Sequence, residues 1–180
     1  GARSPKSGPP PPLAAAAIGV ATPLRREFEE KYELHKWKRG QSAVKMIHSS
    51  EGFCFLASVA GKFQGYGEKV RVYIHPDDGF WYLEGRTQQP LAASAYSLRL
   101  QRDSDVQLKF TEHVWSRGKP AVVMLPQEQG FCFLSSLAGN VAGWGESVKI
   151  KLDPQGAWTL SGQSQQDLSA RAYSVQVLGK

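Results

Sequence analysis

Two stretches of the sequence decide the fold: EGFCFLASVAG at residues 51–61 and QGFCFLSSLAG at residues 129–139, offset by 78 residues. The match extends outward from them in both directions. HKWKRGQSAVKM (35–46) and GYGEKVRVYI (65–74) resemble HVWSRGKPAVVM (113–124) and GWGESVKIKL (143–152). After a one-residue deletion, GFWYLEG (79–85) and QQPLAASAYSL (88–98) resemble GAWTLSG (156–162) and QQDLSARAYSV (165–175). Self-similarity of this length predicts an internal duplication.

The duplication suggests three segments: a linker at residues 1–22, a first repeat at 23–100 and a second repeat at 101–178. Residues 1–22 are rich in Pro and Ala, and this composition predicts a flexible tether. Thr22 and Pro23 suit the start of a helix, so a short helix is predicted over LRREFEEKYEL (24–34). A strand is the alternative, because the equivalent segment of the second repeat alternates apolar and polar residues through Val106, Leu108 and Phe110.

Within each repeat the apolar residues recur at every second position, as in a strand with one buried face. Val70, Val72 and Ile74 form one such run, and Gly-rich or Pro-containing turn signals separate the runs. We therefore expect an all-β protein with five or six short strands per repeat, packed as a sandwich, a barrel or a trefoil-like fold. A unit of about 65 residues buries little surface alone, so the two repeats are expected to share a core.

The overall composition is that of a globular protein, with 180 residues, 41% hydrophobic residues and a net charge of +6. The basic residues cluster only weakly, which argues against a nucleic-acid partner. The longest apolar run, Leu13–Ala21, is too short to span a membrane. The chain starts at Gly1 without a methionine, which favours a fragment of a longer protein. The compartment and the oligomeric state stay open, with an extracytoplasmic or cell-surface location preferred.

Several residues that are identical at equivalent positions of the two repeats are predicted to be structural. These are the tryptophans and charged residues retained in both copies: Trp37, Trp115, Trp81, Trp158, Arg39, Arg117, Glu68 and Glu146. An Arg–Glu pair, or a glutamate that accepts backbone N–H bonds, would explain the charged positions, and ligand contact is the alternative. No metalloprotease, hydrolase or phosphate-binding motif is present, and no metal or cofactor is expected. The HPDDG segment (75–79) is interpreted as a turn.

The cysteines occupy equivalent positions in the two FCFL segments. Strand alternation places Cys54 and Cys132 opposite the neighbouring phenylalanines, which is typical of buried structural thiols. A second interpretation uses symmetry. If the two FCFL strands paired across a pseudo-twofold axis, a disulfide between Cys54 and Cys132 would be geometrically feasible.

The clearest functional signal is a difference between the repeats. Phe80 and Tyr82 alternate with the retained Trp81, but the second repeat has Ala157 and Thr159 in their place. An aromatic surface confined to the first repeat would suit stacking on sugar rings or anchoring a protein partner. The proposed ligand-contacting set is Phe80, Tyr82, Tyr66, Trp144, Tyr73, Arg71, Gln88 and Gln89. Packing of the aromatic residues against Phe28 and Tyr32 is the structural alternative.

These observations favour a non-catalytic binding module that recognises carbohydrate in the manner of a lectin. Tandem β repeats with retained tryptophans and polar amides are a common architecture for such modules, which is an analogy of architecture alone. A structural or protein–protein interaction module is the alternative, and a catalytic or enzyme-accessory domain is the more remote one.

Overall fold

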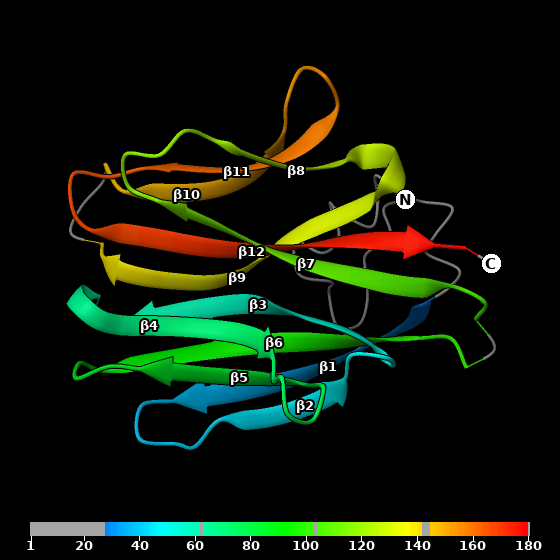
Figure 1. Ribbon diagram of the computed structural model, residues 1–180. Helices are drawn as coiled ribbons and strands as arrows, with labels where there is room; N and C mark the ends of the chain where they lie inside the picture. Colours follow the sequence, from blue (N-terminus) through cyan, green and yellow to red (C-terminus); the bar gives the residue numbers. More distant parts are fainter. Residues whose placement is uncertain (1–27, 62, 103, 142–144, 180) are drawn as a thin grey trace, which may run out of the picture.

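The computed structural model describes residues 28–61, 63–102, 104–141 and 145–179, and in this part of the chain it is built from antiparallel strands (Figure 1). The predicted linker at residues 1–22 and the expected helix start at Thr22 and Pro23 lie outside the described residues. The strands are β1 (Phe28–Lys38), β2 (Val44–His48), β3 (Gly52–Gly61), β4 (Gln64–Ile74), β5 (Phe80–Arg86), β6 (Leu91–Leu100), β7 (Gln107–Ser116), β8 (Val122–Pro126), β9 (Gly130–Asn140), β10 (Ser147–Leu152), β11 (Ala157–Gln163) and β12 (Leu168–Leu178). A 3-10 helix, Gln127–Gln129, precedes β9. The all-β prediction is confirmed.

The helix predicted at residues 24–34 is wrong over its described part, because Phe28–Lys38 forms strand β1. β1 pairs with β6 in antiparallel register from Tyr32 opposite Leu98 to Lys38 opposite Ala92. The four-residue spacing of Phe28 and Tyr32 also fits a period of two, so it does not distinguish a helix from a strand. Pairing with β6 favours the strand, because it satisfies the backbone hydrogen-bonding groups along the edge of β1 that faces β6.

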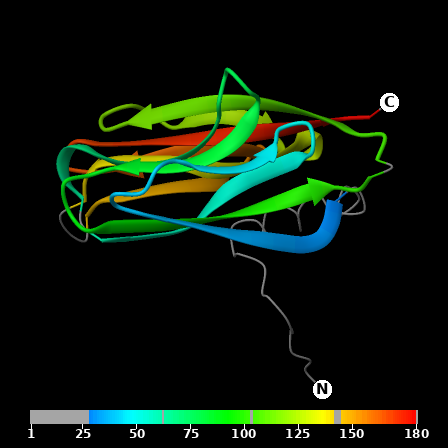
Figure 2. The same cartoon turned by 90° about the horizontal axis from the view of Figure 1, so that it is seen from below.

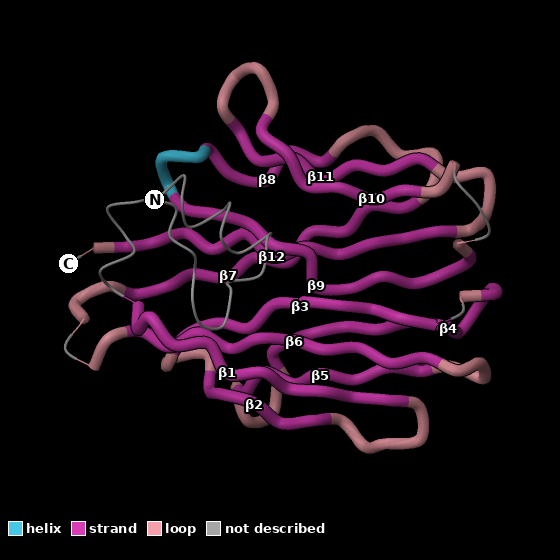
Figure 3. Tube along the Cα trace, turned by 180° about the vertical axis from the view of Figure 1, so that it is seen from behind, coloured by secondary structure: helices cyan, strands magenta, loops and turns pink. Residues whose placement is uncertain are grey.

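The strands form three sheets with the orders β1-β6-β3, β2-β5-β4-β9-β12-β7 and β10-β11-β8. The six-stranded sheet is joined in the middle by β4 and β9, which pair through Val70 opposite Leu137 and Arg71 opposite Ser136. Seen from below, the blue strand β1 and the red strand β12 lie on opposite sides of the molecule (Figure 2). The trace from behind shows the strands running side by side, with short turns at both ends (Figure 3).

At two places a tryptophan ring packs directly against a glycine of another strand. The ring of Trp37 covers Gly85, where an added Cβ would lie 2.4 Å from the ring. Trp115 covers Gly162 with a corresponding distance of 2.6 Å. The indole N–H groups of the other two retained tryptophans donate to backbone carbonyls, Trp81 to Gly52 at 3.1 Å and Trp158 to Gly130 at 3.3 Å. The four tryptophans thus contact glycines or backbone carbonyls of other strands.

The main hydrophobic core contains side chains from both halves of the chain. Phe53 of β3 lies 5.0 Å from Phe131 and 5.5 Å from Phe133 of β9, measured between ring centroids. All three rings are at most 2% exposed. The largest buried cluster therefore combines residues from both halves, while two smaller clusters, around Trp115 and around Trp158, contain residues of the second half. Within the described residues, no helix is long and apolar enough to cross a membrane.

Candidate functional site

The outer face of β5 carries the aromatic residues that distinguish the two halves of the sequence. Trp81 and Leu83 point inward and are completely buried, whereas Phe80 and Tyr82 point the other way and are half-buried. This is the alternation expected from the sequence. Phe28 and Tyr32 do not cover the two outward rings. Phe28 packs against Phe53 and Phe131, and Tyr32 packs against Phe55 and Tyr96.

Four rings on β4, β5 and the turn between them form what we call the aromatic face: Tyr73, His75, Phe80 and Tyr82. Tyr73 and Tyr82 are direct cross-strand partners, and their rings stack at 6.0 Å with an interplanar angle of 28°. His75 lies 5.3 Å from Tyr82. Phe80 meets the ring of His48 edge-on at 5.0 Å. The rings of Tyr73, His75 and Tyr82 thus lie together on neighbouring strands, and Phe80 lies beside His48; all of these rings are half-buried.

One side of the aromatic face is bounded by an ion pair between Arg71 and Glu84. Arg71 Nη2 lies 2.7 Å from Glu84 Oε2, and Arg71 Nε donates to the same oxygen at 2.8 Å. The guanidinium also lies 3.8 Å above the ring of Tyr73. The hydroxyl of Tyr73 donates to Glu84 Oε1 at 3.2 Å. Because each group contacts two others, the charge and the ring are held in fixed positions.

Asp78 organises the other side of the aromatic face. Its carboxylate accepts hydrogen bonds from the Tyr82 hydroxyl at 2.6 Å and from the backbone N–H of Phe80 at 3.0 Å. Lys45 Nζ lies 3.5 Å from Asp78 and 4.0 Å above the ring of Phe80. The bond from Tyr82, followed by that from Phe80, lowers the pKa of Asp78 to about 2. The same bond raises the pKa of Tyr82 to about 12. Asp78 is therefore charged and the phenol protonated at neutral pH.

The predicted binding set is only partly brought together. Arg71, Tyr73, Phe80 and Tyr82 lie on the aromatic face, while the Tyr66 side chain and Trp144 lie outside the described residues. Gln88 and Gln89 follow the opposite end of β5 from Phe80, in the turn that leads to β6. Residues outside the predicted binding set also lie on or beside the face: Lys45, His48, His75, Asp78 and Glu84. Strand register could have identified Glu84, since it lies directly opposite Arg71.

The retained arginines have a structural role different from the predicted Arg–Glu pair. In the described part of the chain, Arg39 Nη1 donates to the backbone carbonyl of Gln88 at 2.8 Å, and Arg117 Nη1 does the same to Gln165 at 3.0 Å. Arg117 also lies 3.4 Å from Asp167. Glu68 is 7% exposed. Each arginine thus holds the turn that contains a retained glutamine, and it does so through the backbone carbonyl of the glutamine rather than through the amide side chain.

The Cys54–Cys132 disulfide is not formed, and both thiols are free and buried. Phenylalanines, rather than cysteines, face each other between β3 and β9, as Phe53 and Phe131 show. Strand alternation turns each cysteine away from the neighbouring phenylalanines; Cys54 belongs to the main core cluster and Cys132 to a smaller cluster with Leu125 and Trp158. Burial raises the pKa of both thiols, that of Cys132 to about 12. The first interpretation, buried structural thiols, is confirmed.

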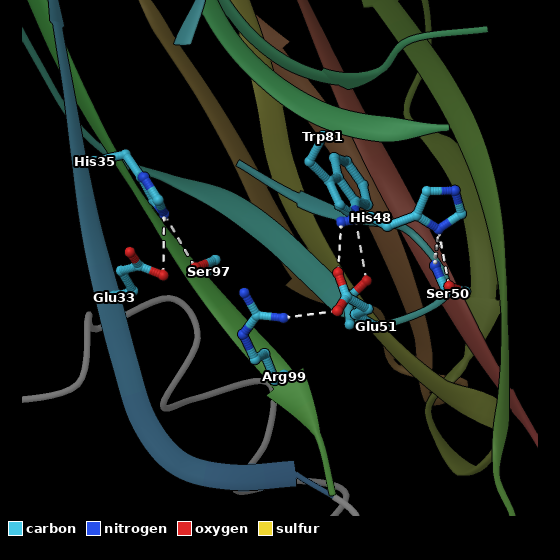
Figure 4. Close-up of polar contacts among 9 residues, drawn as sticks. Glu33, His35, His48, Ser50, Glu51, Trp81, Ser97 and Arg99 are labelled. Carbon is cyan, nitrogen blue, oxygen red and sulfur yellow. Dashed lines mark hydrogen bonds and ion pairs between the residues drawn. The ribbon is translucent and has the colours of Figure 1, made fainter. Parts of the chain in front are cut away.

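Two partly buried histidine–serine pairs occur at equivalent positions. His35 Nε2 lies 3.1 Å from Ser97 Oγ, and His113 Nε2 lies 2.9 Å from Ser174 Oγ. Glu33 approaches His35 at 4.0 Å, but at the same ring nitrogen that contacts Ser97 (Figure 4). A catalytic triad needs the carboxylate at the other nitrogen, so these residues do not form one. The described residues also contain no group of three or more potential metal ligands.

No family model, curated protein or solved structure matches the chain. Its function must therefore be argued from the geometry of its surfaces.

Proposed function

We propose that this protein is a non-catalytic binding module and that its aromatic face binds carbohydrate. In this proposal the chain consists of two homologous repeats, and the first repeat carries the binding surface. The observation that supports it is the combination of Tyr73 and Tyr82 with fixed charged groups on both sides. The corresponding positions on β10 and β11 carry Lys151 and Thr159.

Carbohydrate recognition needs a flat apolar surface and polar groups at its border. Aromatic rings contact the C–H groups of a pyranose, while carboxylates and guanidinium groups bond its hydroxyls. The aromatic face provides both. The carboxylates of Asp78 and Glu84 each have more lone pairs than the contacts above use, and their positions are fixed before a ligand arrives. A fixed surface avoids part of the entropy lost on binding.

A protein ligand is the second candidate, because half-buried Phe80 and Tyr82 resemble the aromatic anchors of protein interfaces. The two candidates differ in what they require. Sugar binding depends on open ring faces beside Asp78 and Glu84, whereas a protein interface would extend over a larger area around them.

The test is a glycan array probed with wild-type protein and with a Phe80→Ala, Tyr82→Thr double variant. These substitutions introduce the residues found at 157 and 159, which the same sequence context accommodates. Leu34→Ala, on an exposed residue of β1, is the control. We expect a glycan signal with wild type and with the control, and at least a tenfold loss of affinity in the double variant. Correctly folded wild-type protein that binds no glycan would overturn the proposal, as would equal binding by the double variant.

A further inference from the structure

The two halves of the structure differ at one junction. β4 and β9 pair and thereby join two three-stranded units into the six-stranded sheet. Their counterparts 78 residues away are β10 and β3, and the same register would place Val148 opposite Val59 and Lys149 opposite Ser58. This pairing is not made. In the described part of the chain β3 pairs with β6 alone and β10 with β11 alone.

An apolar cleft of about 310 Å³ lies where that pairing would be. Val59 of β3 and Val148 of β10 contribute to its two sides, and Leu134 and Leu137 of β9 line it between them. The two strand edges therefore face a common apolar space. Unpaired strand edges present free backbone donors and acceptors, which is what an added strand needs.

The apolar side of β10 packs on the cluster around Trp115, but it is less completely buried than the apolar side of β4. Val70 and Val72 on β4 are completely buried, whereas their counterparts Val148 and Ile150 on β10 are only half-buried. The difference follows from the junction, because β4 is covered by β9 on one side and β10 has no strand there. Another strand in this position would bury the remaining apolar surface and pair both edges.

We propose that an extended peptide segment of another protein binds between β3 and β10 as an added strand. Its side chains would alternate between apolar residues that enter the cleft and acidic residues that face solvent. The acidic preference follows from β10, whose outward side carries the exposed Lys149 and Lys151 next to the cleft. The net charge of +6 acts in the same direction. This site is separate from the aromatic face and does not depend on carbohydrate binding.

The binding test uses three synthetic seven-residue peptides carrying a fluorophore, measured by fluorescence anisotropy. One alternates Val and Glu, the second contains the same residues with the valines and glutamates in two blocks, and the third alternates Val and Lys. We expect saturable binding of the alternating Val/Glu peptide and at least tenfold weaker binding of the other two. Binding should weaken as the salt concentration rises, because exposed charges are screened.

Variants then locate the site. Val148→Glu places a charge in the cleft and should reduce affinity at least tenfold. Val123→Glu is the matched control, because Val123 is 64% exposed on the edge strand β8, away from the cleft. The Lys149→Glu, Lys151→Glu double variant should instead prefer the Val/Lys peptide, which a merely unfolded variant would not do. Thermal unfolding of each variant confirms that it is folded.

Amide hydrogen exchange gives an independent reading. The peptide should protect backbone N–H groups of β3 and β10, and leave the edges of β1, β2, β7 and β8 unchanged. The proposal is overturned if no peptide binds saturably, if Val123→Glu weakens binding as much as Val148→Glu, or if protection appears on other edges. Protection of β3 and β10 in the free protein would also overturn it. The two edges would then already be paired, with each other, with another segment of the chain or with a second copy.

Discussion

At the scale of single residues, the half-buried His35 and His113 predict how stability depends on pH. Burial lowers the pKa of His35; the charge of Arg99 lowers this pKa further, and the charge of Glu33 raises it. Burial also lowers the pKa of His113. Unfolding restores the ordinary value near 6.5, so the unfolded chain binds more protons below that pH. Stability from these two residues is complete above about pH 6.5 and is lost as the pH falls through their lower native values.

This prediction is checked by following the imidazole C–H signals of His35 and His113 by NMR during a pH titration. We expect both to titrate below 6.5 in the native protein and near 6.5 in concentrated urea. The free energy of unfolding should fall from pH 7 to pH 5, and less so in the His35→Gln, His113→Gln double variant. Native midpoints at or above 6.5 would contradict the assignment.

The aromatic face shows what residue patterns could and could not predict. Alternation alone placed Phe80 and Tyr82 on the outward side of β5, because side-chain direction in a strand depends only on position. It could not place Asp78 beneath Tyr82, since that contact depends on the shape of the turn between β4 and β5. The position of Gln88 and Gln89 away from the aromatic face was not predictable for a related reason: it depends on the turn after β5, where Arg39 donates to the backbone carbonyl of Gln88.

At the scale of elements, Gly85 is predicted to be essential for packing β1 against β5. A Cβ there would lie 2.4 Å from the ring of Trp37, which is 3% exposed and cannot move into solvent without opening the layer. We expect Gly85→Ala to lower the free energy of unfolding by about 1–3 kcal/mol, as overpacking of a core does. Urea denaturation measures this. Gly145→Ala is the control, because a Cβ there meets nothing within 4 Å. Equal stability of the two variants would show that the Trp37 layer is not tightly packed.

Strand positions were more predictable than strand partners. Runs such as Val70, Val72 and Ile74 identified β4 because periodicity is a local property. The identity of β1 was ambiguous, since a spacing of four suits both a helix and a strand, and only the partner β6 resolves it. The failure of β3 and β10 to pair could not be predicted either. Their sequences resemble those of β9 and β4, and the difference arises from how the halves are placed.

At the scale of the whole molecule, the core shared by both halves explains why the disulfide considered as the second interpretation of the cysteines is absent. The FCFL strands approach each other through Phe53 and Phe131, so the thiols on their opposite sides face away from the contact. The same arrangement makes the halves dependent on each other. Trp81, from the first half, packs at 6.1 Å against Phe133 and at 5.1 Å against Tyr173, both from the second. Neither half buries these rings by itself, so the chain should unfold as one unit.

Phe133→Ala tests this dependence, because Phe133 is 1% exposed and contacts rings of both halves. Loss of a buried phenylalanine costs about 3–5 kcal/mol of unfolding free energy, through lost burial and the cavity left behind. We expect amide exchange in β1–β6 and in β7–β12 to accelerate together, and urea denaturation to keep one transition at lower concentration. Val123→Ala, on an exposed residue of β8, should change stability by about 0.5 kcal/mol or less. Destabilisation of β7–β12 alone, with a second transition at the wild-type midpoint, would show two independent cores.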